Sequence, residues 1–242
     1  MNKIIGTLYG ISIGPGDPEL ITLKGKRLLK EVPVIAFPTG KANKTGLAEQ
    51  IISFWVNEQQ IKLPLYFPYV KDKKQLWEAW KKAACNVENY LHKGIDVAFA
   101  CEGDVNFFST FTYLAQFILK KYPQISIKTV SGVCSPIVSA STLGVPLAFY
   151  SQNLAILPIV HNVDDIKVIM RWADVIVLLK VSSVYIQIWD ILKSLNLLHK
   201  TSLIIRATQL EERVYKDLTN HRYLSIPYFS LMVIQTNWLK TV

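Results

Sequence analysis

The chain has 242 residues, with 27 Lys and Arg against 18 Asp and Glu, which gives a formal net charge of +9. Half of the residues are hydrophobic, so the sequence is too apolar for a disordered chain and long enough to bury a sizeable core. Its three cysteines, odd in number and widely spaced, argue against a disulfide framework and against a zinc site. No apolar run approaches the roughly 18 residues that cross a bilayer, and no export signal is visible, so we expect a cytoplasmic globular protein without a membrane partner.

Apolar runs alternate with segments of helical period from the N-terminus to beyond residue 200. Asp17 and Pro18 are expected to cap and open the first helix. Residues 73–91 carry apolar side chains on one face and predict a long amphipathic helix. Strand and helix alternation of this kind favours mostly parallel sheets. The expected strands are residues 8–13, 34–37, 95–100, 125–130, 154–159, 175–179 and 203–206.

The pattern changes in the last part of the chain. Residues 213–218 and 229–235 have the character of strands, and the turn-rich segment between them predicts antiparallel pairing. A boundary is expected at residues 146–151, where glycine, proline and polar residues separate a serine-rich helix from a new strand. The sequence therefore predicts an N-terminal α/β domain at 1–148 and a C-terminal α/β domain at 149–242.

The strongest local motif is Gly-Pro-Gly-Asp-Pro-Glu at residues 14–19, between a strand and a helix. Glycines there permit a tight turn and close approach of a ligand to the backbone. A dinucleotide fingerprint requires a third glycine where Glu19 stands and an acidic residue after the second strand, and this sequence has neither. An ordinary turn between a strand and a helix is the alternative.

Two further loops follow predicted strands. Glu102 and Asp104 flank a glycine at the end of the third strand and are considered as a general acid and base pair, with Asp104 as a helix cap as the alternative. Cys134 follows the fourth strand and is either a thiol nucleophile or a small buried residue. No histidine has a spacing that identifies a partner for it, and no metal-binding pattern is present, so no protein-bound metal is expected.

These three loops, taken in this order, resemble the tetrapyrrole methylase family, the S-adenosylmethionine-dependent enzymes of corrin and sirohaem synthesis. The resemblance covers nearly the whole chain, and it rests on residues 14–25, 103–104, 132–133, 203–209 and 212–214. Within the family, the precorrin-2 C(20)-methyltransferase branch is the most similar, through residues 102–104, 108–110, 154–158, 179–181 and 228–231. The sequence departs from the family where Ser131 replaces a proline that commonly precedes the glycine.

The resemblance implies an α/β fold of two domains with a cofactor cleft between them, and S-adenosyl-L-methionine as the methyl donor. Carried over by motif position, the implied cofactor contacts are Pro15, Gly103, Asp104, Phe107, Ser109, Thr110, Cys134 and Ser135, with Lys180 and Ala207 from the second domain. It also implies methylation of carbon 20 of precorrin-2 or of cobalt-factor II in cobalamin biosynthesis, by a homodimer.

The implied substrate is an anionic tetrapyrrole, so the positive net charge is interpreted as Lys and Arg that attract its carboxylates. Arg206 is the best single candidate for this contact, and an ion pair between the domains is the alternative for it. No general base is identified; Glu102, Asp104 and Arg206 are the residues considered for catalysis.

Other functions stay open at this point. Uroporphyrinogen methyltransferases, ribosomal RNA ribose methylases and diphthine synthases share the first loop, and a basic binding module without enzymatic activity is a further possibility. Lysines are spread along the chain without a basic stripe of interleaved aromatic residues, so no nucleic-acid partner is expected.

Overall fold

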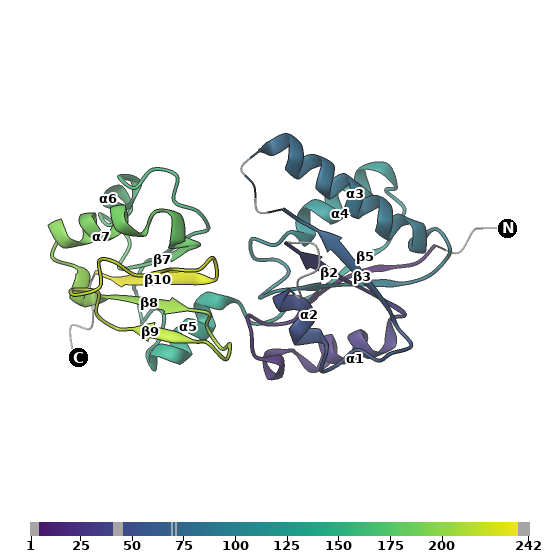
Figure 1. Ribbon diagram of the computed structural model, residues 1–242, viewed down its shortest axis with the longest axis horizontal. Helices are drawn as coiled ribbons and strands as arrows, with labels where there is room; N and C mark the ends of the chain where they lie inside the picture. The colour runs from purple at the N-terminus through teal and green to yellow at the C-terminus, as the bar shows by residue number, and fades with distance from the viewer. Residues whose placement is uncertain (1–4, 41–45, 69, 71, 237–242) are drawn as a thin grey trace. The chain divides into compact units, whose positions relative to one another are not determined.

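The computed structural model describes residues 5–40, 46–68, 70 and 72–236 and consists of two compact units, up to Cys134 and from Ser135 onward (Figure 1). Each unit contains one five-stranded sheet with helices, which confirms the predicted α/β class. The predicted domain boundary falls after residue 148 instead, so the two divisions differ in helix α5 (Ser135–Leu143), which belongs to the second unit. Within the described ranges, no helix has the length and apolar character needed to cross a membrane.

The sheet of the first unit is parallel throughout and has the strand order β3-β2-β4-β1-β5. Strand β1 therefore lies between β4 and β5, although these two follow it much later in the sequence. Because the strands are parallel, the loops that follow β4, β1 and β5 leave from the same edge of the sheet. The strands are β1 (Leu8–Ser12), β2 (Val34–Thr39), β3 (Ile61–Tyr66), β4 (Val97–Cys101) and β5 (Ile127–Val130).

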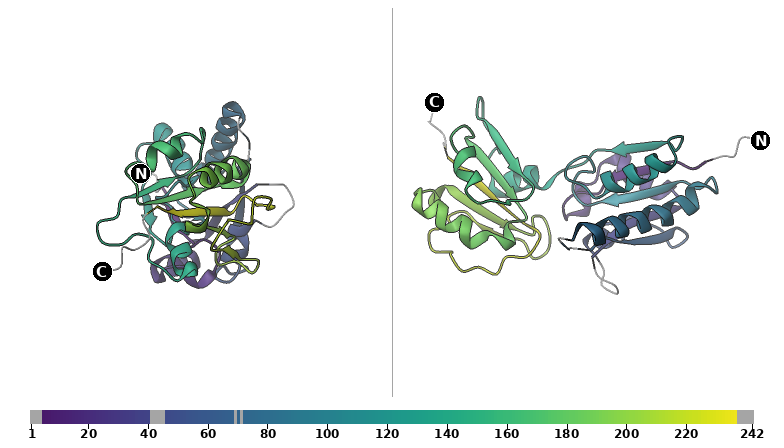
Figure 2. Two further views of the ribbon diagram at one scale, coloured as in Figure 1. Left: turned by 90° about the vertical axis from the view of Figure 1, so that its left-hand side faces the viewer. Right: turned by 90° about the horizontal axis from the view of Figure 1, so that it is seen from above.

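Two helical layers cover the two faces of this sheet, because successive strand residues point to opposite sides. Val34 and Ala36 belong to one apolar cluster with residues of α3 and α4, whereas Ile35 and Phe37 belong to another with residues of α1 and α2. Figures 1 and 2 show α3 and α4 together on one face. The helices are α1 (Leu23–Glu31), α2 (Leu47–Ile52), α3 (Lys73–Leu91) and α4 (Phe111–Lys121).

The first helix begins later than the sequence predicted. Asp17 does act as a cap, since its carboxylate accepts a hydrogen bond from the Glu19 amide at 2.8 Å, but it opens only the 3₁₀ turn η1 (Pro18–Leu20). Helix α1 starts after Thr22, whose hydroxyl accepts from the Gly25 amide at 3.1 Å. The segment 14–22 is thus a loop with one tight turn, and it does not form the first turn of a long helix.

The second unit has a mixed sheet with the order β6-β7-β10-β8-β9, in which only β6 and β7 pair in parallel. The antiparallel end of the chain is confirmed. The last strand, β10, does not pair with β9; it lies between β7 and β8. The elements are β6 (Leu154–Leu157), α6 (Asp165–Ile169), β7 (Val175–Leu179), η2 (Val181–Ser183), α7 (Tyr185–Ser194), η3 (Leu198–Lys200), β8 (Thr201–Ile205), β9 (Arg213–Tyr215) and β10 (Ser230–Gln235).

Candidate functional site

The loops after β1 and β4 are joined by a pair of glycines. The Gly103 amide donates to the Gly14 carbonyl at 2.8 Å, and the Gly14 amide donates to the Gly103 carbonyl at 3.3 Å. Both residues have positive φ, 77° and 71° respectively, a conformation that glycine adopts without steric cost. The strand-end convergence expected from the sequence is therefore present, and both glycines are required by the backbone.

Asp104 joins the loop after β4 to the loop after β5. One carboxylate oxygen accepts from the Gly132 amide at 2.6 Å, and the other accepts from the Asn106 amide at 2.8 Å. Because both oxygens already accept hydrogen bonds from backbone amides, the side chain orders two loops. The structure thus brings together three of the loops that the motifs singled out.

Ser12, at the end of β1, was not singled out from the sequence. Its side chain is fully buried; the hydroxyl donates to the Val130 carbonyl at 2.7 Å and accepts from the Val105 amide at 2.8 Å. The one signal that pointed to it is a small polar residue at the end of a largely apolar strand, two positions before Gly14. Ser12 therefore links the loop after β4 to the last residue of β5, the two strands on either side of β1.

Glu102 lies beside Gly103 but faces a different element. Its carboxylate accepts from the Ala48 amide in the first turn of α2 at 3.1 Å. Burial raises the pKa of Glu102 to about 7, and the bond from Ala48 acts in the opposite direction. A carboxyl group with a pKa near neutrality can hold or release a proton under physiological conditions.

The remaining predicted residues after β4 have different surroundings. The Ser109 hydroxyl is buried, accepts from the Phe111 amide at 3.0 Å, and lies 2.9 Å from the Cys101 sulfur. It therefore satisfies the backbone amide of the first residue of α4. Thr110 occupies the N-cap position of the same helix without a side-chain capping bond. Phe107 is half-buried and packs edge-on against the exposed ring of Phe108, with 4.6 Å between centroids.

Three further predicted residues lie at the borders of these loops. Pro15 is buried between the two glycines of the first loop. Cys134 is half-buried and is the last residue of the first unit, and Ser135 begins α5 in the second. The part assigned to each of the three in binding stays a prediction.

Two of the residues predicted in the second unit, Lys180 and Arg206, directly follow strands and have unusual backbone conformations, a feature shared by Thr208, which was not predicted. Lys180, Arg206 and Thr208 have φ of 55°, 51° and 61°, which L-residues rarely adopt and which recur at functional sites. The Lys180 amide donates to the Ser230 carbonyl at 3.1 Å, and the Arg206 amide donates to the Phe229 carbonyl at 2.7 Å. The ends of β7 and β8 are therefore both held by the beginning of β10.

The side chains at these strand ends have local partners. The Lys180 ammonium lies 5.6 Å from the centre of the Tyr228 ring. Arg206 forms an ion pair with Glu211 within its own unit, and its side chain is 38% exposed, so it is reachable from solvent. Ala207 is buried between the two left-handed residues. That Lys180 and Ala207 share a site with the loops of the first unit stays a prediction.

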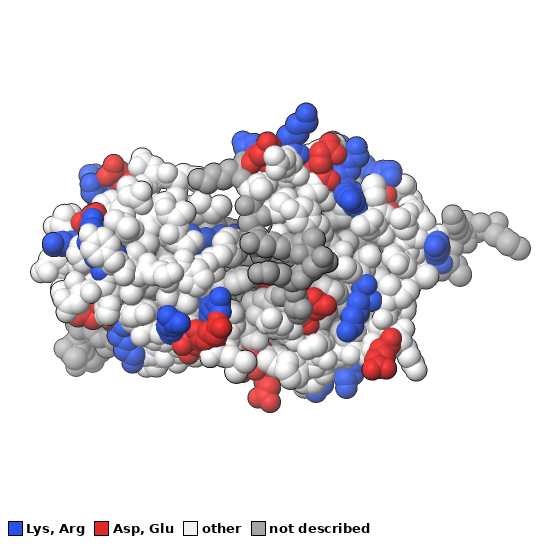
Figure 3. All heavy atoms as spheres, viewed as in Figure 1, with Lys and Arg blue, Asp and Glu red and all other residues white. Residues whose placement is uncertain are grey.

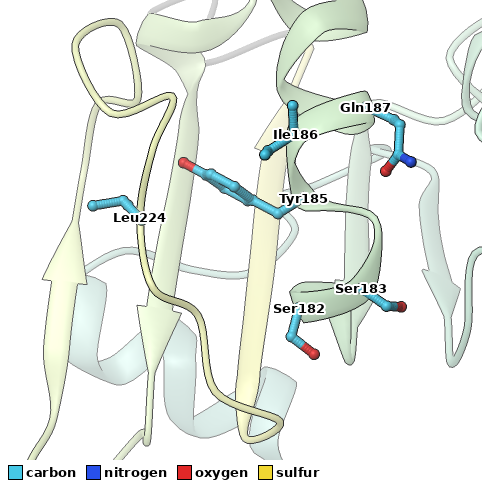
Figure 4. A pocket seen from close by; sticks show the side chains of 6 residues that line it. All are labelled: Ser182, Ser183, Tyr185, Ile186, Gln187 and Leu224. Carbon is cyan, nitrogen blue, oxygen red and sulfur yellow. The ribbon is translucent and has the colours of Figure 1, made fainter.

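The second unit contains a pocket of about 310 Å³, most of whose lining residues follow Lys180 closely in the sequence (Figure 4). Tyr185 extends from the start of α7 toward the loop that carries Leu224, and its hydroxyl donates to the His221 carbonyl at 2.6 Å. None of the residues predicted for the site lines this pocket. Its lining consists of Ser182, Ser183, Tyr185, Ile186, Gln187 and Leu224.

Charged side chains show no concentration of one sign on the face drawn in Figure 3, where Lys and Arg are interspersed with Asp and Glu. In the part of the chain that the structure describes, no three His, Cys, Asp or Glu side chains are grouped so that they could hold a metal ion.

Comparisons with known proteins agree with these motifs. A family model described as Tetrapyrrole (Corrin/Porphyrin) Methylases matches residues 7–220. A probable cobalt-precorrin-2 C(20)-methyltransferase of Methanocaldococcus jannaschii is 35% identical over 158 residues, 65% of this chain and 66% of that relative. The cobalt-precorrin-2 C(20)-methyltransferase of Salmonella typhimurium is 29% identical over 234 residues, 96% of this chain and 98% of that protein.

Among solved structures, the uroporphyrin-III C-methyltransferase of Thermus thermophilus in complex with S-adenosylhomocysteine has a similar fold. Its TM-score is 0.67 at 22% identity, and the match covers 95% of this chain and 97% of that one.

Proposed function

Because the chain belongs to the tetrapyrrole (corrin/porphyrin) methylase family, we propose that it transfers a methyl group from S-adenosyl-L-methionine to carbon 20 of precorrin-2, or of cobalt-factor II, in cobalamin biosynthesis. Family membership confirms the resemblance noted from the motifs. The observation that carries the proposal is similarity over almost the full length of a relative with this named activity. The joined glycine loops at the edge of the first sheet support the cofactor assignment.

The charges of these loops support a cationic cofactor. Residues 14–19, 101–108 and 131–134 contain acidic residues, among them Asp17 and Asp104, but neither Lys nor Arg. A sulfonium carries a positive charge that disappears as its methyl group is transferred, so a strongly cationic wall would weaken binding of the donor. A dinucleotide would instead bring a negatively charged pyrophosphate close to these carboxylates.

The reaction needs little chemical assistance from the protein. The meso carbon of a reduced tetrapyrrole is electron-rich and attacks the methyl carbon directly, so the enzyme has to align the reactants, exclude water and accept one proton afterwards. Alignment of two bound reactants contributes roughly 7–11 kcal/mol in favourable cases. Loops built from glycines and backbone amides suit that task.

The two acidic candidates for proton acceptance differ in their surroundings. Both oxygens of Asp104 accept hydrogen bonds from loop amides, so Asp104 fits the role of ordering the loops. The pKa of Glu102, about 7, fits reversible protonation better. Arg206 fits the role of binding a substrate carboxylate, which would compete with Glu211 for its guanidinium. A cytoplasmic homodimer is part of this proposal, on the basis of the family resemblance.

The test is a methylation assay with S-adenosylmethionine and four separate acceptors: precorrin-2, cobalt-factor II, uroporphyrinogen III and ribosomal RNA. We expect one additional methyl group, located at carbon 20 by NMR, on precorrin-2, on cobalt-factor II or on both. Methylation of uroporphyrinogen alone would move the protein to another branch of the family. Methylation of RNA alone, with a steep dependence on salt, would assign it to a different substrate class.

A further inference from the structure

We propose that Ser12 is a positioning residue for the cofactor: its hydroxyl ties the loop after β4 to the end of β5, and this fixes the loops after both strands at the spacing that cofactor binding requires. The inference rests on the proposed function, because it assumes that these loops contact S-adenosylmethionine. Ser12 itself is fully buried and need not touch the ligand.

The hydroxyl of Ser12 extends the sheet beyond its backbone ladder. The pairing of β1 with β5 ends at Ile11 and Val130, whereas the pairing of β1 with β4 runs on to Ser12 and Cys101. Where the backbone pairing ends, the Ser12 hydroxyl forms the next hydrogen bonds: it donates to the Val130 carbonyl at 2.7 Å and accepts from the Val105 amide at 2.8 Å. One side chain therefore links both neighbours of β1.

The loop after β5 is fitted closely against Ser12. A Cβ added to Gly132 would lie 2.4 Å from the Cβ of Ser12 and 3.5 Å from the Gly103 carbonyl oxygen, so only glycine permits this approach. The backbone amide of Gly132 also donates a hydrogen bond to the Asp104 carboxylate at 2.6 Å. Gly132 thus packs on Ser12 while it is bonded to Asp104, and the two polar side chains fix the same junction from different sides.

Loss of the hydroxyl would leave two backbone groups without partners at a buried position. The Val105 amide and the Val130 carbonyl would then need water or a displaced loop to satisfy their hydrogen bonds. Binding of the cofactor would have to restore the arrangement at the expense of affinity, because ordering mobile loops opposes association. The chemical step would be little affected once the cofactor is bound.

The experiment compares Ser12→Ala with Thr201→Val, a matched loss of a buried hydroxyl. Thr201 is also fully buried, and its hydroxyl donates to the Leu197 carbonyl at 2.8 Å, at the start of β8 in the second unit. Affinity for S-adenosylhomocysteine alone is measured by calorimetry. For Ser12→Ala we expect a dissociation constant at least tenfold higher, about 1.4 kcal/mol, and for Thr201→Val a change below threefold.

Kinetics and exchange separate positioning from a general loss of stability. The KM for S-adenosylmethionine should rise in Ser12→Ala, with kcat at saturating cofactor within threefold of wild type. Amide exchange should accelerate in peptides covering residues 102–108 and 129–135 and slow again when S-adenosylhomocysteine is added. The dissociation constant of Ser12→Cys for S-adenosylhomocysteine should lie between those of wild type and Ser12→Ala, because a thiol is a weaker hydrogen-bond donor and acceptor than a hydroxyl.

A folded Ser12→Ala protein that binds S-adenosylhomocysteine within threefold of wild type would overturn the inference. If Ser12→Ala does not fold, the same criterion applies to Ser12→Cys. Wild-type protein that binds S-adenosylhomocysteine but methylates no tetrapyrrole would refute the proposed function and leave the Ser12 result valid. Wild-type protein without measurable affinity for S-adenosylhomocysteine would refute both.

Discussion

Replacement of Gly103 by alanine tests where the cofactor lies. Gly103 has a φ of 71°, and a Cβ added to it would meet no protein atom within 4 Å. The protein's own cost is therefore the left-handed backbone alone, about 1–2 kcal/mol for an L-residue with a side chain. If the cofactor occupies the space beside Gly103, the new methyl group will displace it.

Gly144 offers a control for the same strain. It follows α5 with a φ of 74°, and an added Cβ would likewise meet nothing within 4 Å. In urea unfolding we expect Gly103→Ala and Gly144→Ala to lose similar stability, about 1–2 kcal/mol each. In calorimetry with S-adenosylhomocysteine we expect only Gly103→Ala to bind at least tenfold more weakly, about 1.4 kcal/mol.

The comparison of the two variants decides the question. A folded Gly103→Ala protein with the affinity of Gly144→Ala would show that the cofactor does not fill the space beside Gly103. A large and equal loss of affinity in both variants would attribute the effect to backbone strain, and the assignment of the Gly103 loop would fail in that case too.

Two further predictions concern ionisable groups whose pKa is shifted in the folded protein. Because burial raises the pKa of Glu102 from 4.5 to about 7, the folded protein keeps a proton that the unfolded chain releases between these values. The free energy of unfolding should therefore fall as pH rises through this window, by up to about 3 kcal/mol, and Glu102→Gln should lose this dependence in urea titrations at pH 5 and pH 8; equal pH slopes in both proteins would contradict it. Burial also raises the pKa of the Cys101 thiol to about 12, whereas Cys85 is exposed. Alkylation of the native protein at pH 8 should modify Cys85 first, and mass spectrometry that finds Cys101 modified equally fast would refute this.

Much of the fold could be predicted because strand and helix periods alternate clearly along the chain. The long helix α3 and strand β7 have the predicted bounds. Strand β3 was missed because Pro64 interrupts it and Lys62 makes it polar. Both features are typical of an edge strand, and β3 does lie at the edge of its sheet. An edge strand has no neighbour on its outer side, so a proline there can lack a backbone N–H without breaking the pairing of the sheet. Central strands are largely apolar along their length and therefore stand out in a sequence, whereas polar edge strands such as β3 do not.

The candidate site could be predicted only where the backbone demands a particular residue type. Gly14 and Gly103 were found because left-handed turns after strands favour glycine. Ser12 was not found, because a serine in a strand has the same local pattern whether it faces a helix or joins two loops. The contact of Asp104 with Gly132 depends on β1 lying between β4 and β5, and strand order is a property of the whole sheet.

The two units arrange their candidate residues by different means. In the first unit, the loops hold one another through Ser12 and Asp104. In the second, β10 holds the ends of β7 and β8, since Ser230 and Phe229 accept the bonds from the two left-handed residues. Strand β10 comes last among the elements of the described residues, so the backbone at Lys180 and Arg206 acquires these bonds only when this strand is inserted. Ending the chain before Phe229 should therefore speed amide exchange at Lys180 and Arg206, far upstream, while the loops of the first unit keep their hydrogen bonds.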